Sequence, residues 1–202
     1  MAREAASDAI LVRMHASRIH ISYPDWVREV VDWEQCLPDD ESKMRLAIRI
    51  ARENVMRDTG GPFGAIIVER GTGRLVSAGM NSVVRLQNPV LHGEVMAFMM
   101  ASARLGSYTL RVPGSPDHEL ITSSEPCAMC LGATLWSGVR RLVWGASRSD
   151  AERVQFDEGP VFAESYDYLR ARGIEVVPAL LREEAAAVLE LYRERAGTIY
   201  NA

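Results

Sequence analysis

Four residues in two short motifs could assemble a hydrolytic metal centre. His92 and Glu94 form a His-x-Glu motif, and Cys127 and Cys130 follow Pro126 in a Pro-Cys-x-x-Cys motif. One imidazole and two thiolates bind zinc and leave a fourth tetrahedral position open to water, which distinguishes catalytic zinc sites from closed structural ones. Zinc lowers the pKa of such a water toward about 7, and a carboxylate that is not a ligand can carry the released proton. The motifs therefore predict zinc-dependent hydrolysis, with Glu94 as the proton carrier.

Both motifs are expected at the beginnings of helices. Val95 to Leu105 contains good helix formers and no proline, and Pro126 stands where a helix commonly begins, before a second helical run that ends at Trp136. Backbone amides and the helix dipole at such positions favour a thiolate over a thiol. Because zinc binds the deprotonated sulfur, this placement suits Cys127 and Cys130 as ligands.

The Cys-x-x-Cys spacing has two other interpretations, a redox pair and a structural zinc site. A redox pair has no need of the His-x-Glu motif, and a structural zinc site would require a fourth protein ligand. Cys36 is the only other cysteine, and two roles stay open for it: a small buried or half-buried thiol, or that fourth ligand. The remaining histidines, which we expect at the surface or at a strand edge, are His15, His20 and His118.

Composition limits the classes of function. A chain of 202 residues with 48% hydrophobic content can bury one sizeable core, so a single domain is expected. The net charge of −4 argues against a nucleic-acid-binding surface and favours a small, neutral substrate. With two of three cysteines assigned to a metal, no disulfide framework is expected, which suits a reducing cytoplasm. No apolar segment is long enough for a signal peptide core or a membrane span, so no membrane association is expected.

The order of predicted elements implies a layered α/β sandwich. Residues 1–38 are an amino-terminal extension, and residues 39–202 form the domain that holds both motifs. Two strands flanking a Gly-Thr-Gly segment predict a hairpin. Helices are expected at 39–58, 92–105, 127–136, 162–171 and 182–195, and strands at 65–68, 75–78, 119–122, 141–144 and 174–177.

Several segments besides the zinc motifs resemble one enzyme superfamily. They are residues 60–64 (GGPFG), 78–81 (AGMN), 124–133 (SEPCAMCLGA), 156–160 (FDEGP) and 199–202 (IYNA). Through them, about residues 40 to 202 resemble the cytidine deaminase-like superfamily, and within it the bacterial guanine deaminases, including members that also accept the triazine ammeline. The resemblance implies a three-layer α/β/α sandwich with a central mixed five-stranded sheet. It also implies a Zn²⁺-dependent homodimer that deaminates a free nucleobase, guanine to xanthine plus ammonia.

The resemblance assigns three residues to binding of the base. Asn81 would hydrogen-bond it, and Phe63 and Trp136 would line or cover its ring. Each residue also has a purely structural interpretation. Phe63 and Trp136 are equally typical of a hydrophobic core, and an asparagine at the exit of a hairpin often caps a turn.

The resemblance also assigns a second carboxylate and a lid. Glu158 would contact the N–H edge of a purine and relay protons, with Asp157 beside it as the alternative. Attack at C2 expels the 2-amino group, and a neutral ring becomes a better electrophile when a ring nitrogen is protonated or strongly hydrogen-bonded. A solvated turn is the structural interpretation of the same two acids. Tyr200 would belong to a carboxy-terminal segment that closes over its own site or that of a partner subunit.

Gly93 departs from many related purine and tRNA deaminases, which have alanine between the zinc histidine and the glutamate. Together with Leu91, it resembles the motif of fungal-type cytosine deaminases, and the missing methyl is expected to reshape the pocket floor. Three alternatives therefore stay open. They are a deaminase of another amino-heterocycle (cytosine, ammeline or a nucleoside), a tRNA adenosine deaminase, which would need a basic face, and a noncatalytic zinc module, which would not need Glu94.

Overall fold

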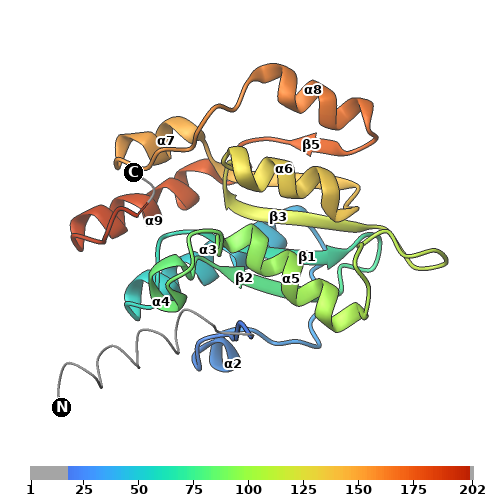
Figure 1. Cartoon of the computed structure of the whole chain (residues 1–202), viewed down its shortest axis with the longest axis horizontal. Coiled ribbons are helices and arrows are strands. Elements are labelled where there is room, and N and C mark those ends of the chain that lie inside the picture. The colour runs from blue at the N-terminus through green and yellow to red at the C-terminus, as the bar shows by residue number, and fades with distance from the viewer. Residues whose placement is uncertain (1–17, 201–202) are drawn as a thin grey trace, which may run out of the picture.

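A mixed five-stranded sheet lies at the centre of the computed structural model, which describes residues 18–200 (Figure 1). The strand order is β2-β1-β3-β4-β5. The pairs β1–β2 and β1–β3 are antiparallel, whereas β3–β4 and β4–β5 are parallel. All five predicted strands are confirmed: β1 (Gly64–Glu69), β2 (Leu75–Met80), β3 (His118–Ser124), β4 (Arg141–Ala146) and β5 (Glu175–Val177).

The five predicted helices are also present, and three short ones were not expected. The predicted helices are α3 (Asp40–Met56), α5 (Gly93–Leu105), α6 (Ala128–Ser137), α8 (Ala163–Ala171) and α9 (Arg182–Glu194). The additional helices are α2 (Val27–Val30), α4 (Val83–Leu86) and α7 (Arg148–Arg153), which are too short for an apolar period to show in the sequence. No helix within residues 18–200 is long and apolar enough to cross a bilayer.

Successive side chains of β1 point to opposite faces of the sheet, and helices cover both faces. Ile66 and Val68 pack into one hydrophobic cluster with α3 and α9, whereas Ala65 and Ile67 pack into a second cluster with α5. The second cluster also includes residues of α6 and α8. The predicted three-layer α/β/α sandwich is therefore confirmed, and Figure 1 shows α6 and α8 together on one side of the sheet.

The described part of the amino-terminal extension packs onto the same core. Residues of α2 are buried in the cluster that contains α3. The Tyr23 hydroxyl donates to the Ala78 carbonyl at 2.9 Å, and the Trp26 indole N–H donates to Thr59 Oγ1 at the same distance. Residues 18–38 thus contribute to the packing of the domain that follows them. Residues 1–17 lie outside the described part of the chain.

A buried ionic network joins α3 to the beginnings of β3 and β4. The Lys43 ammonium lies 2.7 Å from Glu119 Oε1, and the Arg141 guanidinium lies 2.8 Å from Glu119 Oε2. The side chains of all three are at most 11% exposed. This network lies at the end of β3 opposite to the end where the zinc motif follows.

Replacing Glu119 with alanine should lower the free energy of unfolding by about 3 kcal/mol, because two buried cations lose their shared carboxylate. Urea denaturation measures the effect. The matched control is Glu41→Ala, which breaks an ion pair with Arg45 whose side chains are more than half exposed and should cost at most about 0.5 kcal/mol. Equal losses in the two variants would contradict the structural role of this network.

Candidate active site

The predicted zinc ligands converge from the beginnings of two helices. His92 is the N-cap of α5 and Cys127 is the N-cap of α6, both with extended backbone. Cys130 and Glu94 lie within the first turns of these helices. The prediction that both motifs open helices is therefore confirmed.

A glycine in β2 permits this convergence. A Cβ atom at Gly79 would lie 1.9 Å from the Gly93 carbonyl oxygen, which no side chain tolerates. Gly79 thus lets the start of α5 approach the sheet closely. A Cβ at Gly93 itself would point at the Phe63 carbonyl, 3.1 Å away, so the methyl that Gly93 lacks would face backbone.

The three side chains have the geometry of a tetrahedral zinc site. Their ligand atoms all lie within 4.8 Å of one another, and Cys127 Sγ is 3.5 Å from His92 Nδ1. Bond lengths of about 2.3 Å to sulfur and 2.0 to 2.1 Å to nitrogen place tetrahedral ligands about 3.6 Å apart. Among residues 18–200, no other group of His, Cys, Asp and Glu side chains meets the same criterion. One nitrogen and two sulfurs fit zinc and leave a fourth position open.

In the absence of a metal the three ligands share protons, and the negative charge is carried by Cys127. A hydrogen bond with Cys130 and then the contact with His92 lower the pKa of Cys127 to about 4. The contact with Cys127 and burial raise the pKa of Cys130 well above its usual value. Burial disfavours the charged form of His92. The hydrogen bond with Cys127 and the negative charge of Cys127 have a larger combined effect and raise the pKa of His92. Metal binding would displace the protons that these groups share.

Two buried carboxyl groups lie beside the ligands. Glu94 Oε2 accepts from Cys130 Sγ at 3.4 Å, and burial, followed by the charge of Cys127, raises the pKa of Glu94. Burial, followed by the charges of Cys127 and Glu94, raises the pKa of Glu158 to about 8. Asp157 is exposed, and its Oδ1 accepts from the Gly159 amide at 2.8 Å as in a turn. Of the two neighbouring acids, only Glu158 is turned into the site.

Asn81 has the structural role considered from the sequence, and its contact with a base stays a prediction. Its Oδ1 accepts from the Val83 amide at 3.3 Å, as expected of a turn cap. Its Nδ2 is buried and has no hydrogen-bond partner in the part of the chain that the structure describes. The Asn54 side-chain amide holds the backbone at Asn81 in place by donating to the Asn81 and Gly61 carbonyls, each at 2.9 Å. We did not predict Asn54, although a buried amide inside an apolar helix face was a usable signal.

Aromatic rings form one wall of the site. Phe63 meets Phe156 edge to face at 4.9 Å between ring centroids, and Tyr200 lies 5.3 Å from Phe156 and 6.5 Å from the His92 ring. A Cβ atom at Gly61 would lie 2.2 Å from the Tyr200 hydroxyl, so this glycine leaves room for it. Tyr200 thus lies over the site of its own chain. Residues 201–202 lie outside the described part of the chain.

These groups enclose a small cavity of about 10 Å³. Its walls are formed by Phe63, His92, Glu94, Glu125, Cys127, Glu158 and Tyr200. Glu125 was not predicted, although it belongs to the segment that also holds the cysteines.

Trp136 does not line this cavity, contrary to the expectation for a single chain. It is the penultimate residue of α6, at the end away from Cys127, and is 77% exposed. It lies nine positions after Cys127, so the rise of the helix carries it away from the metal ligands.

The other candidate ligands lie elsewhere. Cys36 is exposed and bridges to Arg74, so the expectation of a buried thiol is wrong, and it does not belong to the metal cluster. His118 is buried at the start of β3 with its Nδ1 2.7 Å from the Leu110 carbonyl oxygen, so the surface interpretation is wrong for it. His20 is exposed, and His15 lies outside the described residues.

The chain matches the family described as the cytidine and deoxycytidylate deaminase zinc-binding region over residues 37–146. This segment contains His92, Glu94 and both cysteines. The protein therefore belongs to this family of zinc-dependent deaminases.

Two guanine deaminases and a probable cytosine deaminase are similar to this chain. The guanine deaminase of Bacillus subtilis is 37% identical over 124 residues, which cover 61% of this chain and 75% of the relative. A probable cytosine deaminase of Schizosaccharomyces pombe is 35% identical over 152 residues, 72% of this chain and 87% of the relative. The solved structure of the guanine deaminase from Nitrosomonas europaea has a TM-score of 0.84 and 40% identity, covering 88% of this chain and 97% of that one. A mutant of that protein in complex with 8-azaguanine gives a TM-score of 0.85 at 39% identity, covering 89% and 98%.

The purified protein should hold about one zinc ion per chain, and Cys127→Ala or Cys130→Ala should remove it, because two remaining ligands bind zinc weakly. Elemental analysis of the purified variants measures this. Cys36→Ala is the matched control and should keep full occupancy, since Cys36 lies outside the cluster. Full zinc content in either site variant would contradict the ligand assignment.

Proposed function

We propose that this protein deaminates free guanine to xanthine and ammonia. The observation that carries the proposal is one enclosed cavity that combines a three-ligand zinc site with two buried carboxyl groups, Glu94 and Glu158. The similarity to guanine deaminases over most of the chain supports a purine as the substrate.

Glu94 is placed to move protons at the reacting carbon. A bound zinc ion would supply a water whose pKa is lowered to about 7. Glu94 is not a ligand in the set of three, yet it adjoins Cys130, so it can accept the proton from this water. Its raised pKa favours holding the proton long enough to pass it to the leaving amino group.

Glu158 faces the same cavity from a different loop. Burial raises the pKa of its carboxyl group, so that it can hold a proton and donate a hydrogen bond to a ring nitrogen. Such a bond draws electron density from the ring and makes C2 easier to attack. The two carboxyl groups can therefore act on opposite parts of one base.

The remaining polar groups of the site fit recognition of a base with acceptor atoms. Asn81 Nδ2 and the Tyr200 hydroxyl are buried and make no hydrogen bond of good geometry to a described residue, although the Asn81 side chain lies close enough to Tyr200 to lower the pKa of its hydroxyl. An unsatisfied buried donor costs about 1 to 3 kcal/mol, so a ligand that pairs with both gains affinity. Phe63 supplies an apolar surface for the ring.

Entry of a base requires the site to open. A cavity of about 10 Å³ accommodates about one water molecule, far less than a purine. Tyr200 follows α9 in a segment, residues 197–200, that forms neither helix nor strand. We infer that movement of Tyr200 admits the substrate.

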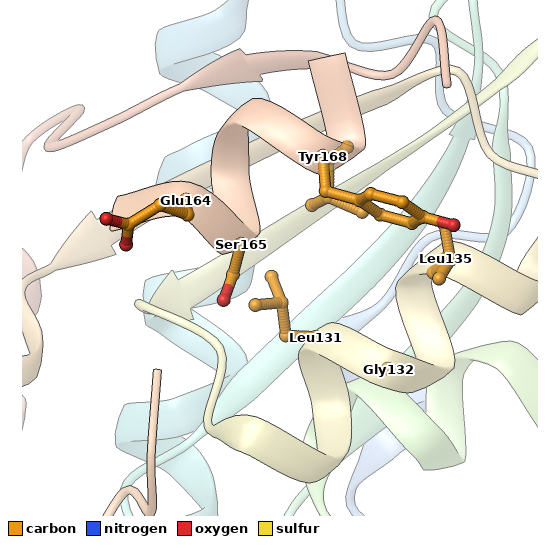
Figure 2. Close-up of a pocket in the computed structure, with 7 residues that line it drawn as sticks. Leu131, Gly132, Leu135, Glu164, Ser165 and Tyr168 are labelled. Carbon is orange, nitrogen blue, oxygen red and sulfur yellow. The ribbon is translucent and has the colours of Figure 1, made fainter. Parts of the chain in front are cut away.

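We propose further that the protein forms a homodimer. A groove of about 360 Å³ lies between α6 and α8, where Leu131 and Leu135 face the ring of Tyr168 (Figure 2). Trp136 is exposed on the same helix α6. Large exposed apolar groups on neighbouring helices are typical of a protein interface. Because Trp136 does not reach its own site, its predicted contact with a base requires a second copy of the chain.

Light scattering should therefore give a mass close to twice the 22.4 kDa of one chain. Trp136→Ser should weaken association, because it removes the largest exposed apolar side chain of this surface. Tyr108→Ser is a matched control, since Tyr108 is 97% exposed but lies outside both helices. A wild type that is monomeric at all concentrations would contradict the dimer.

The proposal places the enzyme in purine metabolism and in the cytoplasm. Free thiolates persist as metal ligands where the compartment keeps cysteines reduced.

Ammonia release should be fastest with guanine in a panel that also contains cytosine, adenine, ammeline and guanosine. Glu94→Gln should lower kcat by about 10² to 10⁴ with zinc content unchanged, because it removes proton transfer and not a ligand. Asp157→Asn, an exposed acid beside the site loop, serves as a control and should retain most activity. A wild type that prefers cytosine would disprove the purine pocket, and near-normal turnover of Glu94→Gln would disprove the role of Glu94.

A further inference from the structure

Glu125 stands two residues before the zinc ligand Cys127 and lines the same cavity as Glu158. Its carboxylate accepts a hydrogen bond at each oxygen. The Tyr166 hydroxyl donates to Oε1 at 2.5 Å, and the Arg148 backbone amide donates to Oε2 at 2.8 Å. Hydrogen bonds to a carboxylate are short and strong, so these two donors fix Glu125 from two sides.

The two donors belong to the helices on either side of the loop that carries Glu158. Arg148 is the first residue of α7, and Tyr166 lies near the start of α8. Residues 154–162 run from one helix to the other, with Glu158 in the middle. A single carboxylate next to the zinc-binding helix therefore holds both helices that flank this loop.

Other contacts make the loop follow these helices. The Arg148 guanidinium donates to the Val161 carbonyl at 2.9 Å, near the end of the loop. The Ala128 amide of the zinc-binding helix donates to the Glu158 carbonyl at 2.9 Å. The Tyr166 ring stacks on Trp144 of β4, with 4.9 Å between centroids, so its hydroxyl group is held in place by the sheet.

We propose that Glu125 and Tyr166 are positioning residues that set where the Glu158 carboxyl group lies relative to the zinc ligands. Tyr166 does not line the cavity, so it acts through Glu125 and the loop. Burial and the hydrogen bond to Glu125 raise the pKa of the Tyr166 hydroxyl far above its usual value, which keeps it a donor. The inference rests on the proposed function in that Glu158 is taken to contact the substrate.

The test begins with Tyr166→Phe, which removes one hydroxyl and keeps the stacked ring. We expect kcat/KM to fall about tenfold for the best substrate, as for loss of one hydrogen bond to a charged group, with zinc content unchanged. Tyr108→Phe is the matched control. Tyr108 is 97% exposed and lies outside the helices that flank the Glu158 loop, and its hydroxyl has no hydrogen bond to the residues described, so activity should stay within about twofold.

A double-mutant cycle with Glu158→Gln separates positioning from general loosening of the fold. If Tyr166 acts through Glu158, adding Tyr166→Phe to Glu158→Gln should change kcat/KM by less than about twofold. Where turnover is too slow to measure, the affinities of the four proteins for 8-azaguanine replace it. An unchanged Tyr166→Phe enzyme, or a tenfold loss in both backgrounds, would overturn the proposal. The cycle is run on whichever heterocycle the wild type deaminates best, so failure with guanine alone affects only the proposed function.

Discussion

The convergence of two helix beginnings on one point is the constraint that organises this protein. Three ligand atoms from α5 and α6 must lie within 4.8 Å of one another, although their helices follow different strands, β2 and β3. The strand β1 lies between these two strands in the sheet, so both helices must lie on the same face and close to it. The absence of a side chain at Gly79 lets α5 approach the sheet this closely. The sheet therefore acts as a rigid base that fixes the spacing of the ligands.

The charges of the site follow from this geometry. Cys127 and three glutamates, Glu94, Glu125 and Glu158, line a cavity with little room for water, and among them the pKa of Cys127 is strongly lowered. Burial, and after it the negative charge of Cys127, disfavours ionisation of the neighbouring acids, which is why the pKa of Glu94 and that of Glu158 are raised. A divalent cation relieves this repulsion for the thiolates, while the glutamates, which are not in the ligand set, remain able to exchange protons. The same cavity thus separates metal binding from proton transfer.

Much of this architecture could be predicted because it depends on local patterns. The helix beginnings follow from Pro126 and from the His-x-Glu motif, and every predicted strand and helix is present. The misses have two causes. Trp136 was assigned to the base from the family resemblance, but the rise of the helix between it and Cys127 carries it away from the site of its own chain. Glu125 has no signal of its own, since its function depends on donors 23 and 41 residues further along.

Buried polar groups at the two ends of the strands differ in whether they have hydrogen-bond partners. At the beginning of β3, Glu119 is paired at both oxygens with buried cations, an arrangement that ties layers together and leaves no capacity for a ligand. At the other end, Asn81 and Tyr200 lie near each other with buried donors that make no hydrogen bond of good geometry to a described residue. Unpaired buried donors lower the stability of the protein without a ligand. They are therefore expected where a bound ligand pairs with them. Within the site the same contrast separates two carboxyl groups: Glu125 is held by two donors, whereas Glu158 has a raised pKa and can change its protonation state. One acid is thus suited to fixing the geometry and the other to taking part in the chemistry.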